Sequence, residues 1–292
     1  MILTKEALAA LVQGAISVEY DDAGYLIPHR LTKKQREFYK SLEKPYPYAC
    51  STPNVRLAFQ TNATDFSIDY RITCGKKCNF DLFVDGAMCW HYYENVANNT
   101  TGTFTFTLPE GTHDVVLYLP YLARASLANL TLPDGATVTP LPWRPTMLLL
   151  GDSITQGALS EYPSSTYANL LPDMLGVCSL NQGVAGEIHR PDMIDSEIGF
   201  VPEIITVAYG TNDFAKCKSA KEVAENATEY YRRVRATFPK AKIFCILPIW
   251  RGDHEPPRAA GSFLSVKQIV RTAAEAVGAT VIDAFNFVPH LP

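Results

Sequence analysis

The protein has 292 residues, of which 47% are hydrophobic and 19% are charged, and its formal net charge is −4 at pH 7. This length and composition are typical of a folded protein with two domains or one large domain, and they exclude a disordered chain. The acidic balance gives no long-range attraction to a phosphate backbone or an anionic lipid surface, so we expect neither nucleic acid nor membrane as partner. A small neutral molecule is the expected ligand.

The N-terminal residues predict a short helix rather than a targeting signal. Thr4 precedes the apolar run from Ala7 to Val12 and is suited to cap a helix. The segment lacks the basic and apolar regions of a signal peptide, so we expect a cytoplasmic protein with reduced cysteines. Cys74 and Cys78 have a spacing found in zinc sites, but no second ligand pair of matching form is present. We therefore expect no metal and no cofactor.

Residues 1–142 are predicted to form a β-rich domain after this helix. Between about Val55 and Leu141 apolar residues alternate with polar ones, which is the pattern of half-buried antiparallel strands. Turn sequences such as Asp85-Gly86 separate the runs. Many short strands at this spacing favour an all-β sandwich of the jelly-roll type. The proline-rich residues 140–145 are the predicted linker.

Residues 143–292 show a different pattern, which predicts an α/β domain. Continuous apolar runs indicate strands buried on both faces, and these are Met147–Leu150, Val177–Leu180, Ile204–Ala208, Ile243–Leu247 and Thr280–Ile282. Capping signals and helical spacing lie between them at Ser219–Phe238 and Ser262–Val277. Alternating strands and helices predict a parallel sheet with right-handed crossovers, in which ligands bind at the carboxyl ends of the strands.

Three of the predicted strands end in polar, glycine-containing sequences that would meet at one edge of the sheet. These sequences are Gly151-Asp152-Ser153-Ile154-Thr155-Gln156-Gly157, Asn181-Gln182-Gly183-Val184-Ala185-Gly186 and Gly210-Thr211-Asn212-Asp213. A serine in a strand-to-helix turn exposes its hydroxyl beside backbone N–H groups, so Ser153 is the candidate nucleophile, with an N-cap serine as the alternative. The sequence is not the Gly-x-Ser-x-Gly elbow of α/β-hydrolases, since no glycine stands two residues after Ser153.

Acyl transfer also needs hydrogen-bond donors for the oxyanion of the tetrahedral intermediate. Gly183 can bring a backbone N–H close because it has no side chain, and Asn212 can supply a side-chain amide from the third sequence. Together with the Ser153 amide they form a predicted three-donor oxyanion hole. The plain alternatives are a tight turn at Gly183 and a loop-capping role for Asn212. Asp152 and Asp213 are expected to hold their loops through hydrogen bonds to backbone N–H groups.

These sequences, in this order and each after a predicted strand, resemble the first three blocks of the SGNH/GDSL hydrolase family of serine esterases. The resemblance runs from about Thr146 to the C-terminus and implies a three-layer, flavodoxin-like α/β domain. It implies Ser153 as nucleophile and oxyanion donor, Gly183 as second donor and Asn212 as third. The preceding β-rich half resembles the jelly-roll modules found before this domain in some bacterial carbohydrate esterases.

The fourth block of the family, Asp-x-x-His, normally supplies the general base and its orienting carboxylate, and it is absent after Ser153. The sequence ends in Val288-Pro289-His290-Leu291-Pro292, and in relatives of this type a similar stretch precedes the missing block. We therefore expect the chain to be truncated. His189, His254 and His290 are weaker candidates for the base, the first two because they lie in loops predicted to flank the cleft.

Trp250 and Arg251 follow the carboxyl end of a predicted strand and are expected to line the substrate cleft, with ordinary packing as the alternative. We interpret the chain as a serine esterase that hydrolyses small acyl esters, acetyl esters of carbohydrates among them, through an acyl-enzyme at Ser153. The carbohydrate part rests on the resemblance alone. The alternatives are a catalytically incomplete hydrolase fold that acts as a carbohydrate-binding module, and an acyl hydrolase of the thioesterase or lipase type.

Overall fold

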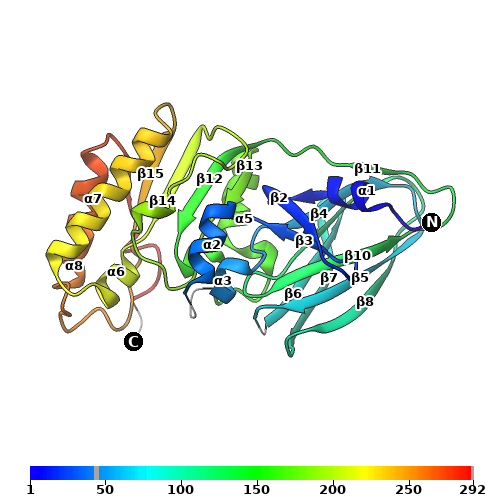
Figure 1. Ribbon diagram of the computed structural model, residues 1–292, viewed down its shortest axis with the longest axis horizontal. Helices are drawn as coiled ribbons and strands as arrows, with labels where there is room; N and C mark the ends of the chain where they lie inside the picture. The colour runs from blue at the N-terminus through cyan, green and yellow to red at the C-terminus, as the bar shows by residue number, and fades with distance from the viewer. Residues whose placement is uncertain (43–45, 76, 291–292) are drawn as a thin grey trace. The chain divides into compact units, whose positions relative to one another are not determined.

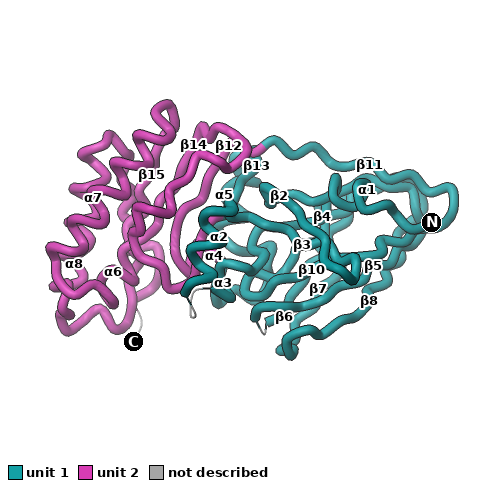
Figure 2. Tube along the Cα trace, viewed as in Figure 1, with its two compact units in different colours: residues 1–144, 157–181 teal, residues 145–156, 182–292 magenta. Residues whose placement is uncertain are grey.

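The structure, a computed structural model, describes residues 1–42, 46–75 and 77–290 (Figure 1). The chain divides into two compact units, and Figure 2 shows that neither is continuous in sequence. Unit 1 comprises residues 1–144 and 157–181, and unit 2 comprises residues 145–156 and 182–292. Antiparallel sheets in unit 1 and parallel strands in unit 2 confirm the predicted succession of a β-rich region and an α/β region. The predicted domain boundary between residues 142 and 143 stays a prediction.

Unit 1 contains two antiparallel sheets. One sheet has the strand order β1 (Val12–Gln13), β4 (Arg56–Thr61), β9 (His113–Tyr118), β6 (Lys77–Val84) and β7 (Ala87–Asn95), with β11 (Val138–Pro140) also paired to β4. The other has the order β2 (Ser17–Tyr20), β3 (Leu26–His29), β10 (Arg124–Thr131), β5 (Asp65–Thr73) and β8 (Thr100–Thr107).

The alternating pattern of the sequence builds the core between these sheets. In β5, Phe66, Ile68, Tyr70 and Ile72 are buried, whereas the residues between them are more exposed. These four side chains belong to one hydrophobic core with residues of the other sheet, and the ring of Phe66 meets that of Phe59 edge to face at 5.6 Å. The two-sheet arrangement is thus present, because each strand turns one apolar face to a shared core. Its jelly-roll connectivity stays a prediction.

Short helices complete unit 1. They are α1 (Lys5–Ala10), α2 (Lys33–Lys40), α3 (Tyr46–Cys50) and α5 (Tyr167–Leu175), and the same unit includes a 3₁₀ turn (Pro163–Ser165) and strand β13 (Cys178–Asn181). The predicted first helix is confirmed, since the Thr4 hydroxyl accepts a hydrogen bond from the N–H of Ala7 over 3.3 Å. Helix α2 begins with a full capping box formed by Thr32 and Gln35.

Hydrogen bonds explain why residues 157–181 belong to unit 1. The Asn54 side chain donates to the carbonyl of Ala168 over 2.5 Å, and the Asp81 carboxylate accepts from the N–H of Ser164 over 2.8 Å. Both Asn54 and Asp81 are at least nine-tenths buried. Buried polar groups of this kind are costly to leave unpaired, so these bonds fix the segment to the β-rich unit.

In unit 2, strands β12 (Pro145–Gly151), β14 (Ile204–Ala208), β15 (Lys242–Leu247) and β16 (Thr280–Asp283) pair in parallel in that order. The helices of the unit are α4 (Ser153–Gln156), α6 (Thr211–Lys216), α7 (Ala220–Thr237) and α8 (Phe263–Glu275), and a 3₁₀ turn spans Pro191–Met193. The continuous apolar runs form strands whose side chains are buried on both faces of the sheet. In β12, for example, Met147 to Leu150 are all buried. The parallel strands and their helices confirm the predicted α/β region, and the three-layer arrangement stays a prediction.

Helices α7 and α8 pack against each other through their apolar faces. The buried residues of α7 are Val223, Ala227, Tyr230, Tyr231 and Val234. The capping signal predicted at its start, Ser219 with Glu222 three residues later, forms only half of a capping box. The Ser219 hydroxyl accepts from the N–H of Glu222 over 3.1 Å, but the Glu222 carboxylate accepts from the N–H of Lys218 instead of that of Ser219. Over the ranges that the structure describes, no helix combines the length and the apolarity needed to span a membrane.

Candidate active site

The structure brings together the three polar loops that follow β12, β13 and β14. The N–H of Val184 donates to the carbonyl of Gly151 over 2.9 Å, and the N–H of Ala185 donates to the Gln156 side chain over 2.6 Å. The Asn212 amide then joins the third loop to the first, since its Nδ2 donates to Asp152 Oδ2 over 3.3 Å. The juxtaposition expected from strand ends is therefore present in unit 2.

Ser153 is the first residue of α4 and follows β12 after one residue, Asp152. Asp152 closes this turn, because its Oδ1 accepts from the N–H of Ile154 over 3.0 Å and its carbonyl accepts from the N–H of Gln156 over 3.0 Å. The Ser153 side chain is half-buried, and within residues 1–42, 46–75 and 77–290 the structure records no hydrogen bond to its hydroxyl. The turn thus holds the Ser153 hydroxyl at the start of α4 without a hydrogen bond from its own residues. The role of nucleophile stays a prediction.

Gly183 lies where no other residue would fit. A Cβ atom at this position would stand 2.7 Å from the backbone nitrogen of Gln156 and 2.8 Å from the Cβ of Thr155. Both distances are below the closest approach that real Cβ atoms show, so only glycine lets this loop press against α4. The close approach puts the Gly183 backbone beside the turn that carries Ser153. Its role as second oxyanion donor stays a prediction that this geometry supports.

The Asn212 side chain links loops. Its Nδ2 donates to the carbonyl of Glu187 over 3.0 Å and to Asp152 over the longer distance of 3.3 Å. An amide nitrogen has two hydrogens, so both are engaged in this state. For Asn212 to serve as third oxyanion donor, the long bond to Asp152 has to be exchanged for one to the substrate. The predicted role therefore requires a small rearrangement of this side chain.

Two buried carboxylates, Asp152 and Asp213, lie behind these loops. Asp152 is only 2% exposed, and this burial raises the pKa of its carboxyl to about 7, with the charge of Asp213 acting in the same direction. The hydrogen bond from the N–H of Ile154 opposes the rise. The expectation that both aspartates hold loops through backbone N–H groups is confirmed, since Asp213 Oδ1 accepts from the N–H of His189 over 3.2 Å.

His189 is not at the surface of the cleft, contrary to its expected place in a flanking loop. Its imidazole is fully buried and its Nδ1 lies 2.9 Å from Asp213 Oδ1. The rings of Tyr209, Tyr230 and Tyr231 surround it, with centroids at 5.2, 5.4 and 5.8 Å. Its Nε2 has no hydrogen-bond partner among the described residues. The loop folds inward because Asp213 offers the polar partner that a buried imidazole needs, an interaction that the sequence spacing does not reveal.

Arg251 lies against the loop that carries Asn212. Its guanidinium donates to the carbonyl of Thr211 over 3.0 Å and pairs with both carboxylate oxygens of Asp253, at 2.5 and 2.8 Å. This pairing lowers the pKa of Asp253 to about 2. Arg251 therefore adjoins the candidate site with its charge already partnered. Its predicted contact with substrate stays a prediction.

Trp250 lies in an aromatic cluster with the two remaining candidate histidines of unit 2. Its ring stacks on that of His290 with centroids 5.2 Å apart and an interplanar angle of 14°. The ring of His254 is 5.9 Å away, and its Nδ1 lies 2.8 Å from the carbonyl of Arg251. In the described part of the chain neither histidine is hydrogen-bonded to Ser153. The role of Trp250 in the substrate cleft stays a prediction.

The parallel strands and the three joined loops define an α/β domain with a serine in its first strand-to-helix turn. Residues 149–291 match the model of the GDSL-like Lipase/Acylhydrolase family, and this part of the chain is a domain of that family. A search of curated proteins found no match.

Solved structures share the fold over most of the chain. Salicylyl-acyltransferase SsfX3, from a tetracycline biosynthetic pathway, has a TM-score of 0.80 at 20% identity, covering 94% of this chain and 82% of its own. A family two carbohydrate esterase from Cellvibrio japonicus has a TM-score of 0.67 at 17% identity, covering 94% and 85%. The family two carbohydrate esterase from Clostridium thermocellum in complex with cellohexaose has a TM-score of 0.61 at 19% identity, covering 79% and 81%. At these identities the likeness shows the fold alone.

Proposed function

We propose that the protein is a serine esterase that cleaves small acyl esters of a hydroxylated substrate through an acyl-enzyme at Ser153. The observation that carries the proposal is the joining of the three polar loops around the Ser153 turn by the bonds to Gly151, Gln156 and Asp152. The match of residues 149–291 to a family of lipases and acylhydrolases supports the same chemistry.

In the proposed reaction, Ser153 Oγ attacks the ester carbonyl carbon and its proton passes to a base. The negative charge on the carbonyl oxygen is held by the N–H groups of Ser153 and Gly183 and by the Asn212 amide once it leaves Asp152. The C–O bond to the alcohol then breaks, the base returns the proton to the leaving alcohol, and water hydrolyses the acyl-enzyme. Each donor lowers the activation barrier by about 3 kcal/mol in comparable enzymes.

The general base of this proposal is a histidine other than His189. His189 is fully buried, and its Nδ1 is engaged by Asp213. Between Ser153 and Pro292 there is no Asp-x-x-His sequence, and in the described residues neither His254 nor His290 is hydrogen-bonded to Ser153. Measuring hydrolysis by His254→Ala and His290→Ala tests each of these histidines as the base. If the protein hydrolyses no ester, the alternative of a carbohydrate-binding module without catalysis is favoured.

The substrate that we propose is an acylated carbohydrate. Two structures that share the fold are carbohydrate esterases, one of them in complex with cellohexaose. SsfX3 is an acyltransferase, so an alcohol in place of water as acyl acceptor is the second candidate. Assays in the presence and absence of a sugar alcohol, with product analysis by mass spectrometry, separate hydrolysis from transfer.

The experiment that tests the nucleophile is hydrolysis of p-nitrophenyl acetate by the protein and by its Ser153→Ala variant. We expect the variant to lose activity by a factor of about 10³ or more while keeping its circular dichroism spectrum. Ser196→Ala changes an exposed serine of the same unit and is the matched control. Labelling by a fluorophosphonate should add mass to the Ser153 peptide. Equal rates for the protein and for Ser153→Ala would contradict the proposal.

A further inference from the structure

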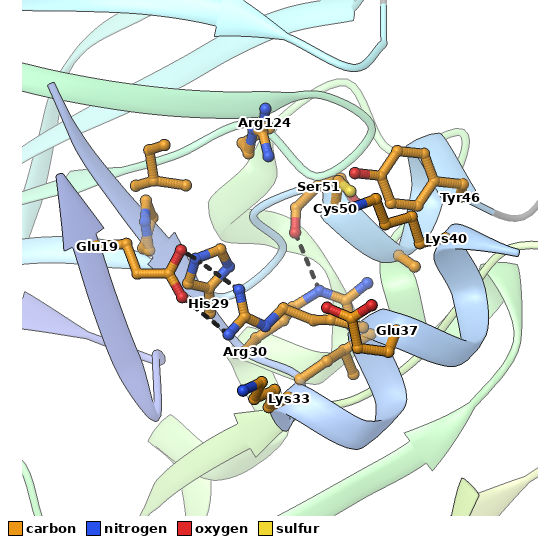
Figure 3. Close-up of a pocket in the computed structure, with 15 residues that line it drawn as sticks. Glu19, His29, Arg30, Lys33, Glu37, Lys40, Tyr46, Cys50, Ser51 and Arg124 are labelled. Atoms are coloured by element: carbon orange, nitrogen blue, oxygen red, sulfur yellow. Dashed lines mark hydrogen bonds and ion pairs between the residues drawn. The ribbon is translucent and has the colours of Figure 1, made fainter. Parts of the chain in front are cut away.

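Unit 1 contains a cavity of about 390 Å³ that the esterase proposal does not use (Figure 3). Its walls come from Glu19 of β2, strand β3, helix α2, helix α3 and Arg124 of β10. This volume is within the range of cavities that hold small molecules.

Cationic side chains dominate the lining of this cavity. Within the described residues they are Arg30, Lys33, Arg36, Lys40 and Arg124, against the two carboxylates of Glu19 and Glu37. The chain as a whole has a net charge of −4, so this excess of positive charge is local. Figure 3 shows Arg124 at the top of the cavity, and Lys33 and Lys40 apart at the two ends of α2 with Glu37 between them. Cations gathered around a concave surface concentrate a positive potential in it.

One of the two carboxylates is already partnered. Glu19 Oε1 lies 2.9 Å from the Arg36 guanidinium, and its Oε2 lies 3.2 Å from His29 Nε2. The hydrogen bond from Arg36 lowers the pKa of Glu19. Burial and the charge of Arg36 lower the pKa of His29 to about 4, so His29 is neutral at neutral pH. Glu19 is therefore matched by Arg36, and it does not neutralise the remaining cations.

Arg30 and Arg124 are held in place by bonds to neutral groups. The Arg30 guanidinium, 2% exposed, donates to the carbonyls of Ser51, Tyr48 and Asn181 at 3.0, 2.9 and 3.1 Å. Arg124 Nε donates to Thr73 Oγ1 over 2.8 Å, a bond that does not engage its terminal amino groups, and Arg124 lines the cavity. Arg124, anchored through Nε, can offer its terminal amino groups as a donor pair to an oxyanion, whereas all three nitrogens of Arg30 already donate to carbonyls.

We propose that this cavity binds a small molecule carrying a phosphate monoester, with Arg124, Lys33 and Lys40 contacting the phosphate. The excess of cations over carboxylates suits a dianion better than a single carboxylate. Arginine provides the bidentate contact and lysine the mobile charge that phosphate sites use. The cavity lies wholly in residues of unit 1, so the proposal stands whether or not Ser153 is a nucleophile.

Isothermal titration calorimetry of the full protein with glucose 6-phosphate tests the proposal. We expect binding with a Kd of about 1 mM or tighter at low ionic strength, and weaker binding at about 150 mM salt because exposed charges are screened. Glucose serves as the uncharged control and glucuronate as the carboxylate control. Tighter binding of glucuronate than of glucose 6-phosphate would overturn the assignment to phosphate.

Variants decide whether the binding belongs to this cavity. Arg124→Gln and the double variant Lys33→Gln/Lys40→Gln should each weaken binding by about tenfold or more. Lys221→Gln removes an equal single charge from an exposed site in unit 2, 83% exposed, and should leave the affinity unchanged. Lys33 and Lys40 are exposed, so the double variant gives a result even if Arg124→Gln does not fold. Unchanged affinity in the folded variants, or no binding by the protein itself, would overturn the proposal.

Discussion

The imidazole of His189 lies 2.9 Å from the carboxylate of Asp213, and neither side chain is exposed to solvent. Removing one member of a buried pair leaves the other without its partner in a medium of low polarity. His189→Ala should therefore lower the free energy of unfolding by about 3 to 5 kcal/mol, measured by urea denaturation. His113→Ala breaks a pair with the half-exposed Asp85, which water screens, and should cost much less. Similar losses in both variants would contradict this reading of the pair.

Adding a methyl group at Gly183 should create a steric clash with the turn that carries Ser153. In Gly183→Ala the added Cβ would meet the backbone nitrogen of Gln156 at 2.7 Å, so the loop has to move away from α4. We expect a loss of about 1 to 3 kcal/mol in unfolding free energy and a lower kcat on p-nitrophenyl acetate. Gly252→Ala is the matched control, because its Cβ would make an ordinary contact of 3.6 Å with Trp250. A kcat equal to that of the parent protein would remove Gly183 from the oxyanion hole.

Asp152 should make the stability of the protein depend on pH. Its pKa is about 7 in the folded state and about 3.9 in an unfolded chain, so between these values the folded state binds more protons. The contribution of Asp152 to the free energy of unfolding therefore falls as the pH rises from about 4 to about 7. The slope is at most about 1.4 kcal/mol per pH unit. Asp152→Asn removes the titration.

The test compares urea denaturation of the protein and of Asp152→Asn at pH values of about 5 and about 7.5. The stability of the variant relative to the parent should increase with pH. The Ile154 N–H can still donate to the asparagine oxygen, so the turn is expected to persist. A difference between the two proteins that is the same at both pH values would contradict the raised pKa.

Asn212→Ala should separate the loop-linking role of this amide from its catalytic one. Loss of an oxyanion donor lowers kcat by a factor of about 10² to 10³ with little change in KM. Loss of the bonds to Glu187 and Asp152 lowers the unfolding free energy by about 1 to 3 kcal/mol. Steady-state kinetics and urea denaturation of the same variant measure the two effects. A stability loss with unchanged kcat would assign Asn212 to loop linkage alone.

Most of the strands could be predicted, because their burial follows a simple period. The strands of unit 1 that alternate apolar and polar residues, such as β5, lie where the pattern predicts them. Strand β7 (Ala87–Asn95) did not stand out, since most of its residues are partly or fully exposed and no apolar alternation marks it. Helix α2 was also missed, although Thr32 and Gln35 form a capping box that the sequence displays. The capping signal was present, but Phe38 and Tyr39 are the only apolar or aromatic residues among the eight of α2, so no helical apolar period marks it.

The candidate site was predictable where it depends on strand ends and not where it depends on distant partners. The meeting of the Ser153, Gly183 and Asn212 loops follows from parallel strands that end at one edge. The burial of His189 depends on Asp213, 24 residues away, and on the tyrosines of α7. Periodicity shows which residues of α7 face inward, but not which loop they cover. A pairing of this kind becomes visible only when the chain is folded.

The bonds from Asn54 to Ala168 and from Asp81 to Ser164 have a further consequence. Because residues 157–181 are integral to unit 1, the backbone passes from one unit to the other three times, near residues 144, 156 and 181. A protease that cut only near residue 144 would separate residues 1–144 covalently from the rest, while residues 157–181 of unit 1 would stay covalently joined to unit 2. A fragment starting at residue 145 would carry α5 and β13 without the β-rich unit to which they belong. The two units are thus expected to be inherited and exchanged together, and not as independent modules.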